Sequence, residues 1–254
     1  MHPQSSRQTS LDPRGVHAWL VTTPADAVPS ELATLFASYD RRAYQQRALG
    51  LEAAEVVGRL VDSFDREDGL TAMSRDRHGV TGLAQIVPAV TSGRRLGRRM
   101  WTLRHLVVQG PHARAATHRM ASTLIAALGD TADFIDGRLA ADDFAALHGL
   151  TDAGFRVCGS ELVGALDPNA VPAPADHAGA RVVEMTERHL AAVQAIAVAT
   201  HRHNRFAYDE GFDDVAVERV WSGLVAGQLV DPAVGTLVAE SRSDGTTLGF
   251  ITFK

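Results

Sequence analysis

The sequence predicts a protein of the α/β class, in which a mixed central sheet is flanked by helices. The arrangement occurs twice along the chain, and the second copy is expected to be incomplete. One observation is a repeat: residues 72–75 and 82–84 have counterparts about 167 positions later, at 239–242 and 249–251. The other is the order of patterns around both passages, which runs strand, helical stretch, strand, polar turn, strand. The same offset places residues 14–16 over residues 181–183.

Alternating and helical periodicities predict the elements of the first copy. Leu32, Leu35, Phe36 and Tyr39 lie at helical spacing behind Ser30, which we expect to be the N-cap. Gly154 should end the last helix in the left-handed conformation. The predicted strands are 15–23, 69–74, 80–87, 99–109, 133–138 and 155–166, and the predicted helices are 29–48, 51–64, 113–128 and 141–153.

The second copy begins after a proline-rich, polar segment, residues 167–176, which predicts a domain boundary. Its predicted elements are a strand at 180–184, a helix at 186–199 capped by Thr186, a helix at 215–226, and strands at 236–241 and 247–253. We therefore expect a disordered lead at 1–13, a first domain at 14–166, a linker at 167–179 and the N-terminal half of a second domain at 180–254. Because the first copy runs on for roughly eighty residues past its hairpin, we expect the second copy to be truncated at Lys254.

Composition excludes some classes of function. The chain has 254 residues, a net charge of −5 and a pI near 6.1, which gives no reason to expect nucleic acid or an anionic membrane as partner. The densest basic stretch, residues 94–99, is expected to be a solvated loop between two strands. Cys158 is the single cysteine and is expected to be a small residue within a strand, which suits a reducing cytoplasm. No apolar stretch reaches the roughly 18 residues that span a bilayer.

Three passages, taken in order, resemble the GNAT acyltransferase family. Residues 181–186 followed by a helix resemble the opening strand and helix of such domains. Residues 235–240 and 248–251 resemble the second and third strands, and residues 134–144 resemble the degenerate N-terminal domain of dTDP-fucosamine acetyltransferase-like proteins. The resemblance covers nearly the whole chain after Gly15 and implies a tandem GNAT fold, whose element order is strand, two helices, three strands, helix, strand, helix, strand.

The resemblance also implies a binding site for acetyl-CoA, the acetyl donor, at the start of the helix after the fourth strand. Family members hold the pyrophosphate there on the amides of an Arg/Gln-x-x-Gly-x-Gly/Ala loop, because glycine lets phosphate approach the main chain. In this sequence Arg114 stands at the leading basic position, while Ala115, Thr117 and Arg119 stand where the family prefers glycine or small residues. This favours a structural domain that has lost cofactor binding over a working site, although His118 and Arg119 are able to attract an anion.

The candidate acceptor site is the polar, aromatic segment after the first helix of the second copy. If the acceptor is a nucleotide-linked amino sugar, Arg205 can pair with its diphosphate and Phe206 or Tyr208 can stack on sugar or base, with Asn204 beside them. The alternative is a solvated helix end with Arg205 paired to Asp209. His201 and His203 diverge at helical spacing and have no carboxylate at ligand spacing, so no metal is expected.

Two functions remain open from the sequence. The first is an N-acetyltransferase that moves an acetyl group from acetyl-CoA to the primary amine of a small acceptor; its catalytic acid and base cannot be assigned. The alternative is a catalytically inactive ligand-binding or regulatory GNAT-like module. For either function we expect a cytoplasmic protein with no metal and no nucleic-acid or membrane partner. The outer edge of the strand at 247–253 is open to pairing, which allows a homodimer.

Overall fold

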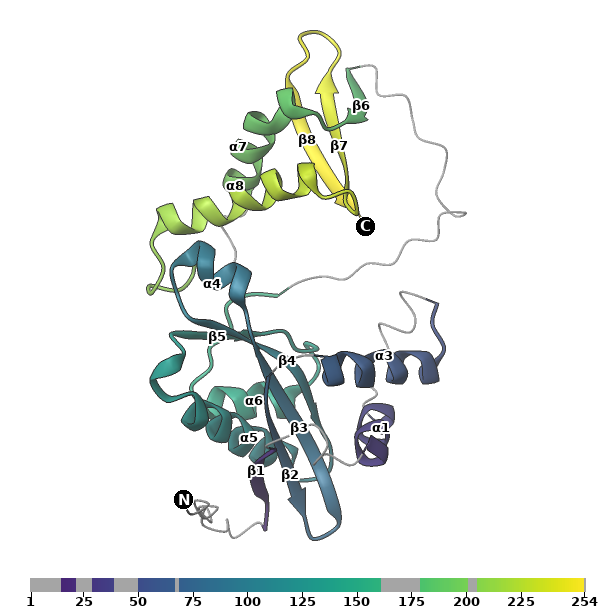
Figure 1. Cartoon of the computed structure of the whole chain (residues 1–254), viewed down its shortest axis with the longest axis vertical. Helices are drawn as coiled ribbons and strands as arrows, with labels where there is room; N and C mark the ends of the chain where they lie inside the picture. The colour runs from purple at the N-terminus through teal and green to yellow at the C-terminus, as the bar shows by residue number, and fades with distance from the viewer. Residues whose placement is uncertain are drawn as a thin grey trace. The chain divides into compact units, whose positions relative to one another are not determined.

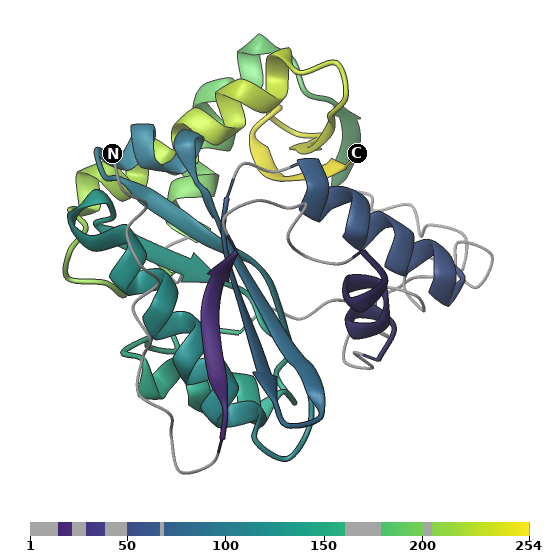
Figure 2. The same ribbon diagram turned by 60° about the horizontal axis from the view of Figure 1, so that its bottom comes forward.

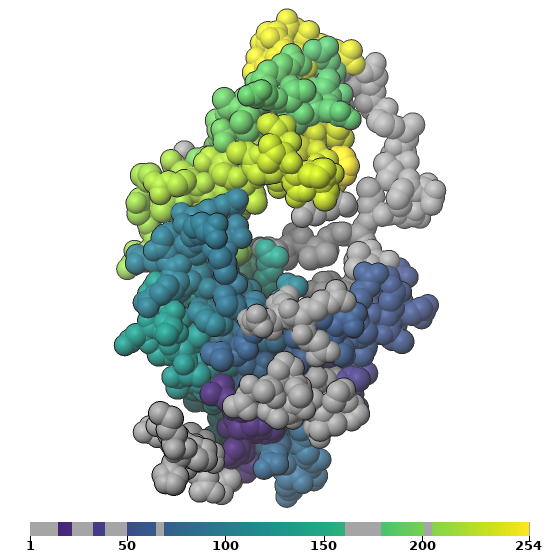
Figure 3. Space-filling model, viewed as in Figure 1, coloured from purple at the N-terminus to yellow at the C-terminus, as the bar shows by residue number. Residues whose placement is uncertain are grey.

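The computed structural model describes residues 15–21, 29–38, 50–66, 69–160, 179–200 and 205–253. The chain divides into two compact units (Figures 1 and 3). Unit 1 comprises Met1–Gly93, Arg98–Val157 and Leu162–Ala165, and unit 2 comprises Arg94–Gly97, Cys158–Glu161 and Leu166–Lys254. The predicted lead at 1–13 and most of the predicted linker at 167–179 lie outside the described residues. The predicted domain boundaries therefore stay predictions.

Unit 1 is built on a five-stranded mixed sheet with the order β1-β2-β3-β4-β5. The first four strands pair in antiparallel fashion, and only β4 and β5 are parallel. Parallel neighbours need a crossover, and helix α5 provides it. The strands are β1 (His17–Val21), β2 (Leu70–Asp76), β3 (Gly79–Pro88), β4 (Met100–Val108) and β5 (Phe134–Gly137).

Helices cover both faces of this sheet, and each face has its own apolar core. Figure 2 shows α1 (Pro29–Ser38) and α3 (Ala53–Arg66) on one side and α5 (Ala113–Leu128) and α6 (Phe144–Asp152) on the other. On the α1–α3 side, Phe36 and Phe64 pack against Met73 of β2. On the α5–α6 side, Met120 and Leu124 pack against strand residues such as Ala84. Alternation along each strand supplies both cores.

Unit 2 repeats the first five of these elements. Its sheet has the order β6-β7-β8, antiparallel throughout, and α7 and α8 pack against it. Val193 and Val225 of the two helices meet Val238 of β7 in the core. The elements are β6 (Ala180–Glu184), a 3-10 turn (Glu187–His189), α7 (Leu190–Thr200), α8 (Asp214–Val230), β7 (Gly235–Ser241) and β8 (Thr247–Phe253). The predicted sequence of strand, two helices and a hairpin is thus present in both units.

The fixed offset between the copies, however, does not survive in the strand pairing. Ser74 pairs with Ala18 in unit 1, and its counterpart Ser241 pairs with Ala180 in unit 2. By pairing, residues 181–183 therefore correspond to residues 19–21, and not to residues 14–16 as the sequence offset predicts, because hydrogen-bond register and not sequence spacing sets which residues face each other. The two hairpin turns also differ, since β3 begins three residues after β2 ends and β8 begins six residues after β7 ends.

Several local predictions are corrected by the structure. The basic stretch 94–99 is not wholly a loop, because helix α4 (Val90–Leu96) includes its first residues. Helix α1 begins at Pro29, so Ser30 lies inside it and is not the N-cap. Residues 155–160 are not a strand, so Cys158 is a half-buried cysteine outside the sheets. Residues 39–48 of the predicted first helix and residues 161–166 of the predicted last strand lie outside the described residues.

The end of α6 explains why the strand predicted at 155 does not start there. Gly154 has a φ of 95°, as expected for a glycine that ends a helix. The amide of Gly154 donates to the carbonyl of Thr151, and that of Phe155 donates to the carbonyl of Leu150 at 3.0 Å. This is the Schellman pattern, in which the residue after the glycine folds back over the last turn. Phe155 accordingly packs into the core on the α5–α6 side.

Candidate functional site

The segment proposed for acetyl-CoA, from Arg114 to Arg119, lies within the first two turns of α5. The helix begins at Ala113, whose amide donates to the carbonyl of Gly110 at 3.2 Å, and Gly110 itself has a φ of 86°. His112 is the N-cap residue, and its side chain makes no capping hydrogen bond. The segment predicted to be a phosphate-binding loop is therefore part of a helix. Its side chains project outward from the helix, and its backbone does not form a glycine-rich loop that phosphate could approach closely.

Arg114 is held by an ion pair with the end of α6. Its Nε donates to Oδ2 of Asp152 at 2.6 Å and its Nη2 donates to Oδ1 at 2.8 Å, which is a bidentate arrangement. The hydrogen bonds from Arg114 lower the pKa of Asp152 below its ordinary value. The ion pair thus fastens the start of α5 to the end of α6, and it engages the side chain that the resemblance assigns to phosphate.

Thr117 faces α6, where it lies against Gly149. It is fully buried, and its Oγ1 has no hydrogen-bond partner among the described residues. A Cβ added to Gly149 of α6 would lie 2.5 Å from Cβ of Thr117 and 2.6 Å from the carbonyl oxygen of Arg114. Ala115 and Arg119 are half-buried on other sides of the helix. Thr117 thus serves helix packing in the place where the family prefers a small residue.

The sheet of unit 1 opens as a fork between β4 and β5. The two strands pair only from Met100 with Phe134 to Leu103 with Gly137, while β4 continues to Val108. The β3–β4 register shifts between Gln85 and Ile86, which leaves a bulge in β4. Beyond Leu103, the edge of β4 that faces β5 therefore has no strand partner among the described residues.

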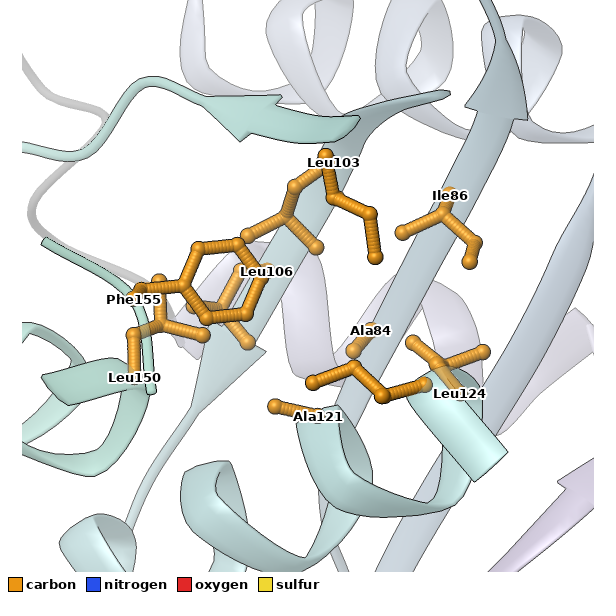
Figure 4. Close-up of a pocket in the computed structure, with 10 residues that line it drawn as sticks. Ala84, Ile86, Leu103, Leu106, Ala121, Leu124, Leu150 and Phe155 are labelled. Atoms are coloured by element: carbon orange, nitrogen blue, oxygen red, sulfur yellow. The ribbon is translucent and has the colours of Figure 1, made fainter. Parts of the chain in front are cut away.

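An apolar pocket lies beside this fork, on the α5–α6 face (Figure 4). Its empty volume is about 270 Å³, including its open mouth. Figure 4 shows Leu103 and Leu106 of β4 and Phe155 directed toward it, with Ala121 and Leu124 of α5 opposite. The lining consists of Ala84, Ile86, Leu103, Leu106, Ala121, Leu124, Ile125, Ile135, Leu150 and Phe155. It offers no polar group to a ligand.

A buried polar cluster lies on the opposite face of the same sheet, and the sequence analysis missed it. Nε2 of His105 lies 2.9 Å from Oγ of Ser63 in α3, and the ring of His105 contacts Phe36 edge to face. Gln85, the cross-strand neighbour of His105, donates to the carbonyl of Phe64 at 3.4 Å. The signal that could have found the cluster is a polar residue at an inward position of a strand otherwise apolar on that face.

The proposed acceptor segment of unit 2 is a turn between α7 and α8. The guanidinium carbon of Arg205 lies 4.6 Å from the ring centroid of Phe206, which is buried and contacts Phe212 edge to face at 5.4 Å. Tyr208 is 56% exposed. Oδ1 of Asp209 accepts the amide of Gly211 at 2.9 Å, which closes the turn. Asn204 lies outside the described residues, as do residues 201–203.

This arrangement divides the proposed acceptor residues by exposure. Phe206 belongs to the packing of the turn, with Arg205 on its face and Phe212 at its edge. Tyr208 is the aromatic ring that faces solvent.

A buried carboxylate organises the other end of unit 2, and it too was missed. Glu240 of β7 is almost fully buried; its Oε1 accepts from Nη2 of Arg188 and from Nε2 of His189, both at 2.7 Å, and its Oε2 accepts from Nε of Arg181 at 2.9 Å. Nδ1 of His189 accepts the amide of Thr186 at 2.9 Å. Because Nδ1 is an acceptor, a neutral His189 carries its proton on Nε2 and donates it to Glu240. The hydrogen bond from His189 is the largest cause that lowers the pKa of Glu240.

The described residues offer no side-chain group for a metal ion and no helix that could cross a membrane. No group of three or more histidine, cysteine, aspartate or glutamate side chains there could hold a metal ion. Among the helices of the described ranges, none combines the length and the apolar character that crossing a membrane requires.

No protein-family model and no curated protein matches the chain. Solved structures do resemble it. A tandem GNAT protein from the clavulanic acid biosynthesis pathway is 14% identical, with 93% of this chain and 73% of that chain covered and a TM-score of 0.41. A probable acetyltransferase is 19% identical, with 60% and 97% covered and a TM-score of 0.40. A transcriptional regulator from Bacillus halodurans C-125 is 13% identical, with 59% and 100% covered and a TM-score of 0.43.

These likenesses are remote, and they assign no activity, substrate or partner to this chain. The pairing within the molecule is more direct evidence of fold. Four antiparallel strands, one parallel strand after a crossover helix, and a pair of helices on each face follow the order predicted for unit 1. Unit 1 thus has a mixed α/β architecture in the predicted order of elements from β1 to α6, and unit 2 has the first five of these elements.

Proposed function

We propose that the chain is an N-acetyltransferase of the GNAT type, which transfers an acetyl group from acetyl-CoA to the primary amine of a small acceptor. The observation that carries this proposal is the fork in unit 1, where β4 runs beyond its pairing with β5 and leads directly into α5. An open strand edge can pair with an extended amide-bearing arm such as pantetheine.

The proposed acceptor is a nucleotide-linked amino sugar, which would meet unit 2 at the turn after α7. Tyr208 supports this part of the proposal because its exposed ring can stack on a sugar or base. Arg205 can pair with a diphosphate once its guanidinium turns from the ring of Phe206. Asn204 completes the proposed set. Acyl transfer to an amine also requires a group that takes the proton of the amine, and none of these residues is assigned that role.

The test is mass spectrometry of the full chain incubated with acetyl-CoA and a panel of amines that includes nucleotide-linked amino sugars. We expect an acetylated product from at least one amine. Substitution of Tyr208 by alanine should lower kcat/KM for that acceptor roughly fivefold, since an aromatic contact contributes about 1 kcal/mol. Phe144→Ala, which removes a similarly exposed ring from unit 1, is the matched control and should leave kcat/KM unchanged.

A second candidate, a GNAT-like module that binds without turnover, is favoured by a separate observation. The ion pair of Arg114 with Asp152 and the packing of Thr117 on Gly149 engage the segment that would have to receive pyrophosphate. Absence of acetylation for every amine, together with retained binding of one of them, would support this module and overturn the enzyme.

A further inference from the structure

The bulge in β4 places two leucines on the same face of the sheet. Gln85 of β3 pairs with His105, whereas the next residue, Ile86, pairs with Leu103, so β4 has one residue more than β3 at this point. Strict alternation would put Leu103 and Leu106 on opposite faces, because they are an odd number of positions apart. The extra residue reverses the alternation. Both leucines therefore face α5 and α6, where they line the apolar pocket (Figure 4).

This pocket lies over the point at which β4 and β5 separate. Leu103 and Gly137 form the last pair of the two strands, and Leu106 lies beyond that pair on β4. Ile135 of β5 and Leu106 of β4 nevertheless line the same pocket. The pocket thus adjoins the stretch of β4 whose edge toward β5 has no strand partner among the described residues.

The exposure of the lining residues shows that the pocket has a closed inner end and an open mouth. Ala84, Ile86 and Leu124 are almost fully buried, whereas Ile125 is 37% exposed and Phe155 is half-buried. The empty volume of about 270 Å³ includes this mouth. The enclosed part therefore suits a group of a few carbon atoms.

The pocket and the open edge together define the chemistry of a ligand. The lining is wholly apolar, so a hydroxyl, amide or carboxylate placed there would lose its hydrogen bonds to water without replacement. A water molecule would likewise find no polar partners to hold it. The open edge of β4 beside the pocket, in contrast, suits the amides of an extended arm. The combination matches a ligand that has an amide-bearing arm and an apolar tip.

We propose that the pocket binds the alkyl chain of an acyl-CoA longer than acetyl-CoA, so that the favoured donor carries a propionyl or butyryl group. This role of the pocket rests on the proposed function, in which the pantetheine arm pairs with β4 beyond Leu103. The acyl group is attached at the end of that arm, next to the pocket. An acetyl group has a single methyl beyond its carbonyl and would leave most of the pocket empty.

The lining also argues against two other apolar ligands. A free fatty acid would bring its carboxylate to a pocket in which no side chain carries a charge. A long acyl chain such as octanoyl would have to displace Leu106 and Leu124, which belong to the closely packed core on the α5–α6 side. A short chain on a thioester avoids both costs.

Calorimetric titration of the full chain with acetyl-, propionyl-, butyryl- and octanoyl-CoA tests the proposal. We expect the dissociation constant to fall about fourfold for each methylene added from acetyl to butyryl, the usual effect of burying a CH₂ group. Octanoyl-CoA should bind no more tightly than butyryl-CoA, because the pocket is then full. The titration needs no acceptor, so its result does not depend on finding the amine.

Two variants of the lining connect this preference to the pocket. Ala121→Leu fills the pocket from α5, and Ile125→Trp narrows its mouth at a partly exposed position. Each should reduce the ratio of the acetyl-CoA and butyryl-CoA dissociation constants from roughly fifteen to about two or less. Ala126→Leu is the matched control: Ala126 is exposed on the same helix and does not line the pocket, so the ratio should stay as in wild type. Circular dichroism confirms that each variant is folded.

The possible failures are distinguishable. Equal dissociation constants for acetyl-CoA and butyryl-CoA overturn the acyl-chain pocket and leave the proposed function standing. So does a preference for butyryl-CoA that survives both Ala121→Leu and Ile125→Trp, or an affinity that rises further with octanoyl-CoA, since the chain would then lie outside the pocket. If none of the four thioesters binds, the proposed function is overturned together with the acyl-chain pocket.

Discussion

Gly149 sits where α5 and α6 touch, and the space above it is occupied by Thr117 and by the main chain of Arg114. Gly149→Ala would place a methyl group 2.5 Å from a β-branched side chain and 2.6 Å from a carbonyl oxygen, so the helices would have to separate. We expect a loss of about 1–3 kcal/mol in the free energy of unfolding, as for other overpacked sites. Urea denaturation measures it.

Gly58 of α3 provides the control for that substitution. A Cβ at Gly58 would meet nothing within 4 Å, so Gly58→Ala should stabilise the protein by up to about 1 kcal/mol through helix propensity. Equal effects of the two alanines would mean that the α5–α6 contact is looser than described.

Glu240 makes the stability of unit 2 depend on pH. Its pKa is lowered chiefly by the hydrogen bond from His189 and also by Arg181 and Arg188, against the opposing effect of burial. Because the folded-state pKa lies below the ordinary value of 4.5, the stabilisation is complete above that value and is lost as the pH falls through the folded-state pKa. Glu240→Gln should therefore destabilise the protein at neutral pH, and the difference from wild type should shrink in acid.

Thermal unfolding followed from neutral to acid pH checks this prediction. Parallel curves for the wild-type protein and Glu240→Gln at every pH would mean that the carboxylate charge contributes nothing to the network. This network was beyond the reach of sequence analysis, because Glu240 and its partner His189 are 51 positions apart and no sequence pattern shows that the two side chains meet.

The short 3-10 turn before α7 depends on a capping box. The side chain of Thr186 accepts the amide of His189, and the side chain of His189 accepts the amide of Thr186. Thr186→Ala should cost about 1 kcal/mol, the usual effect of losing an N-cap. Thr200→Ala, at the other end of α7, removes a hydroxyl that donates to carbonyls of the preceding turn and should cost less.

Chemical denaturation of both threonine variants distinguishes the two positions. A Thr186→Ala protein as stable as wild type would indicate that the Glu240 network alone holds this turn.

Long elements with strong periodicity were predictable, and short ones were not. Helix α5 was predicted at 113–128 and lies at those residues, because four turns of apolar spacing outweigh its Arg and His side chains. Helix α4 has seven residues, contains Gly93 and two arginines, and was taken for a loop. It forms because the amide of Arg98 returns to the carbonyl of Gly93, a close approach that only glycine allows.

The candidate sites were predictable to a smaller degree. The sequence identified Arg114 and Thr117 by position, but it could not show that Asp152 and Gly149 of α6 engage them. These contacts depend on how α5 and α6 cross, and no local pattern encodes that angle. For the turn of unit 2, sequence analysis likewise identified Phe206 and Tyr208, but it could not show that the first is buried and the second exposed.

At the scale of the whole molecule, the chain holds the same arrangement of five elements twice, with side chains of different chemistry. The cross-strand pair Trp19 and Met73 in unit 1 corresponds to the pair Arg181 and Glu240 in unit 2. An apolar contact in one copy is thus an ion pair in the other. The repeat was visible in the sequence because the order of elements persists when side chains change, whereas the register was not, since it is set by the turns.

We propose that unit 1 holds the pantetheine arm of acetyl-CoA at the fork between β4 and β5, while α5–α6 packing has replaced the phosphate site that the resemblance implies. Calorimetric titration of acetyl-CoA into the full chain, its Arg114→Gln variant and its Asp152→Asn variant tests this most directly. Both substitutions break the same ion pair, but only the first removes the cation. We predict that acetyl-CoA binds all three proteins with the same dissociation constant. Loss of binding in Arg114→Gln with stronger binding in Asp152→Asn, where the guanidinium is released, would contradict it.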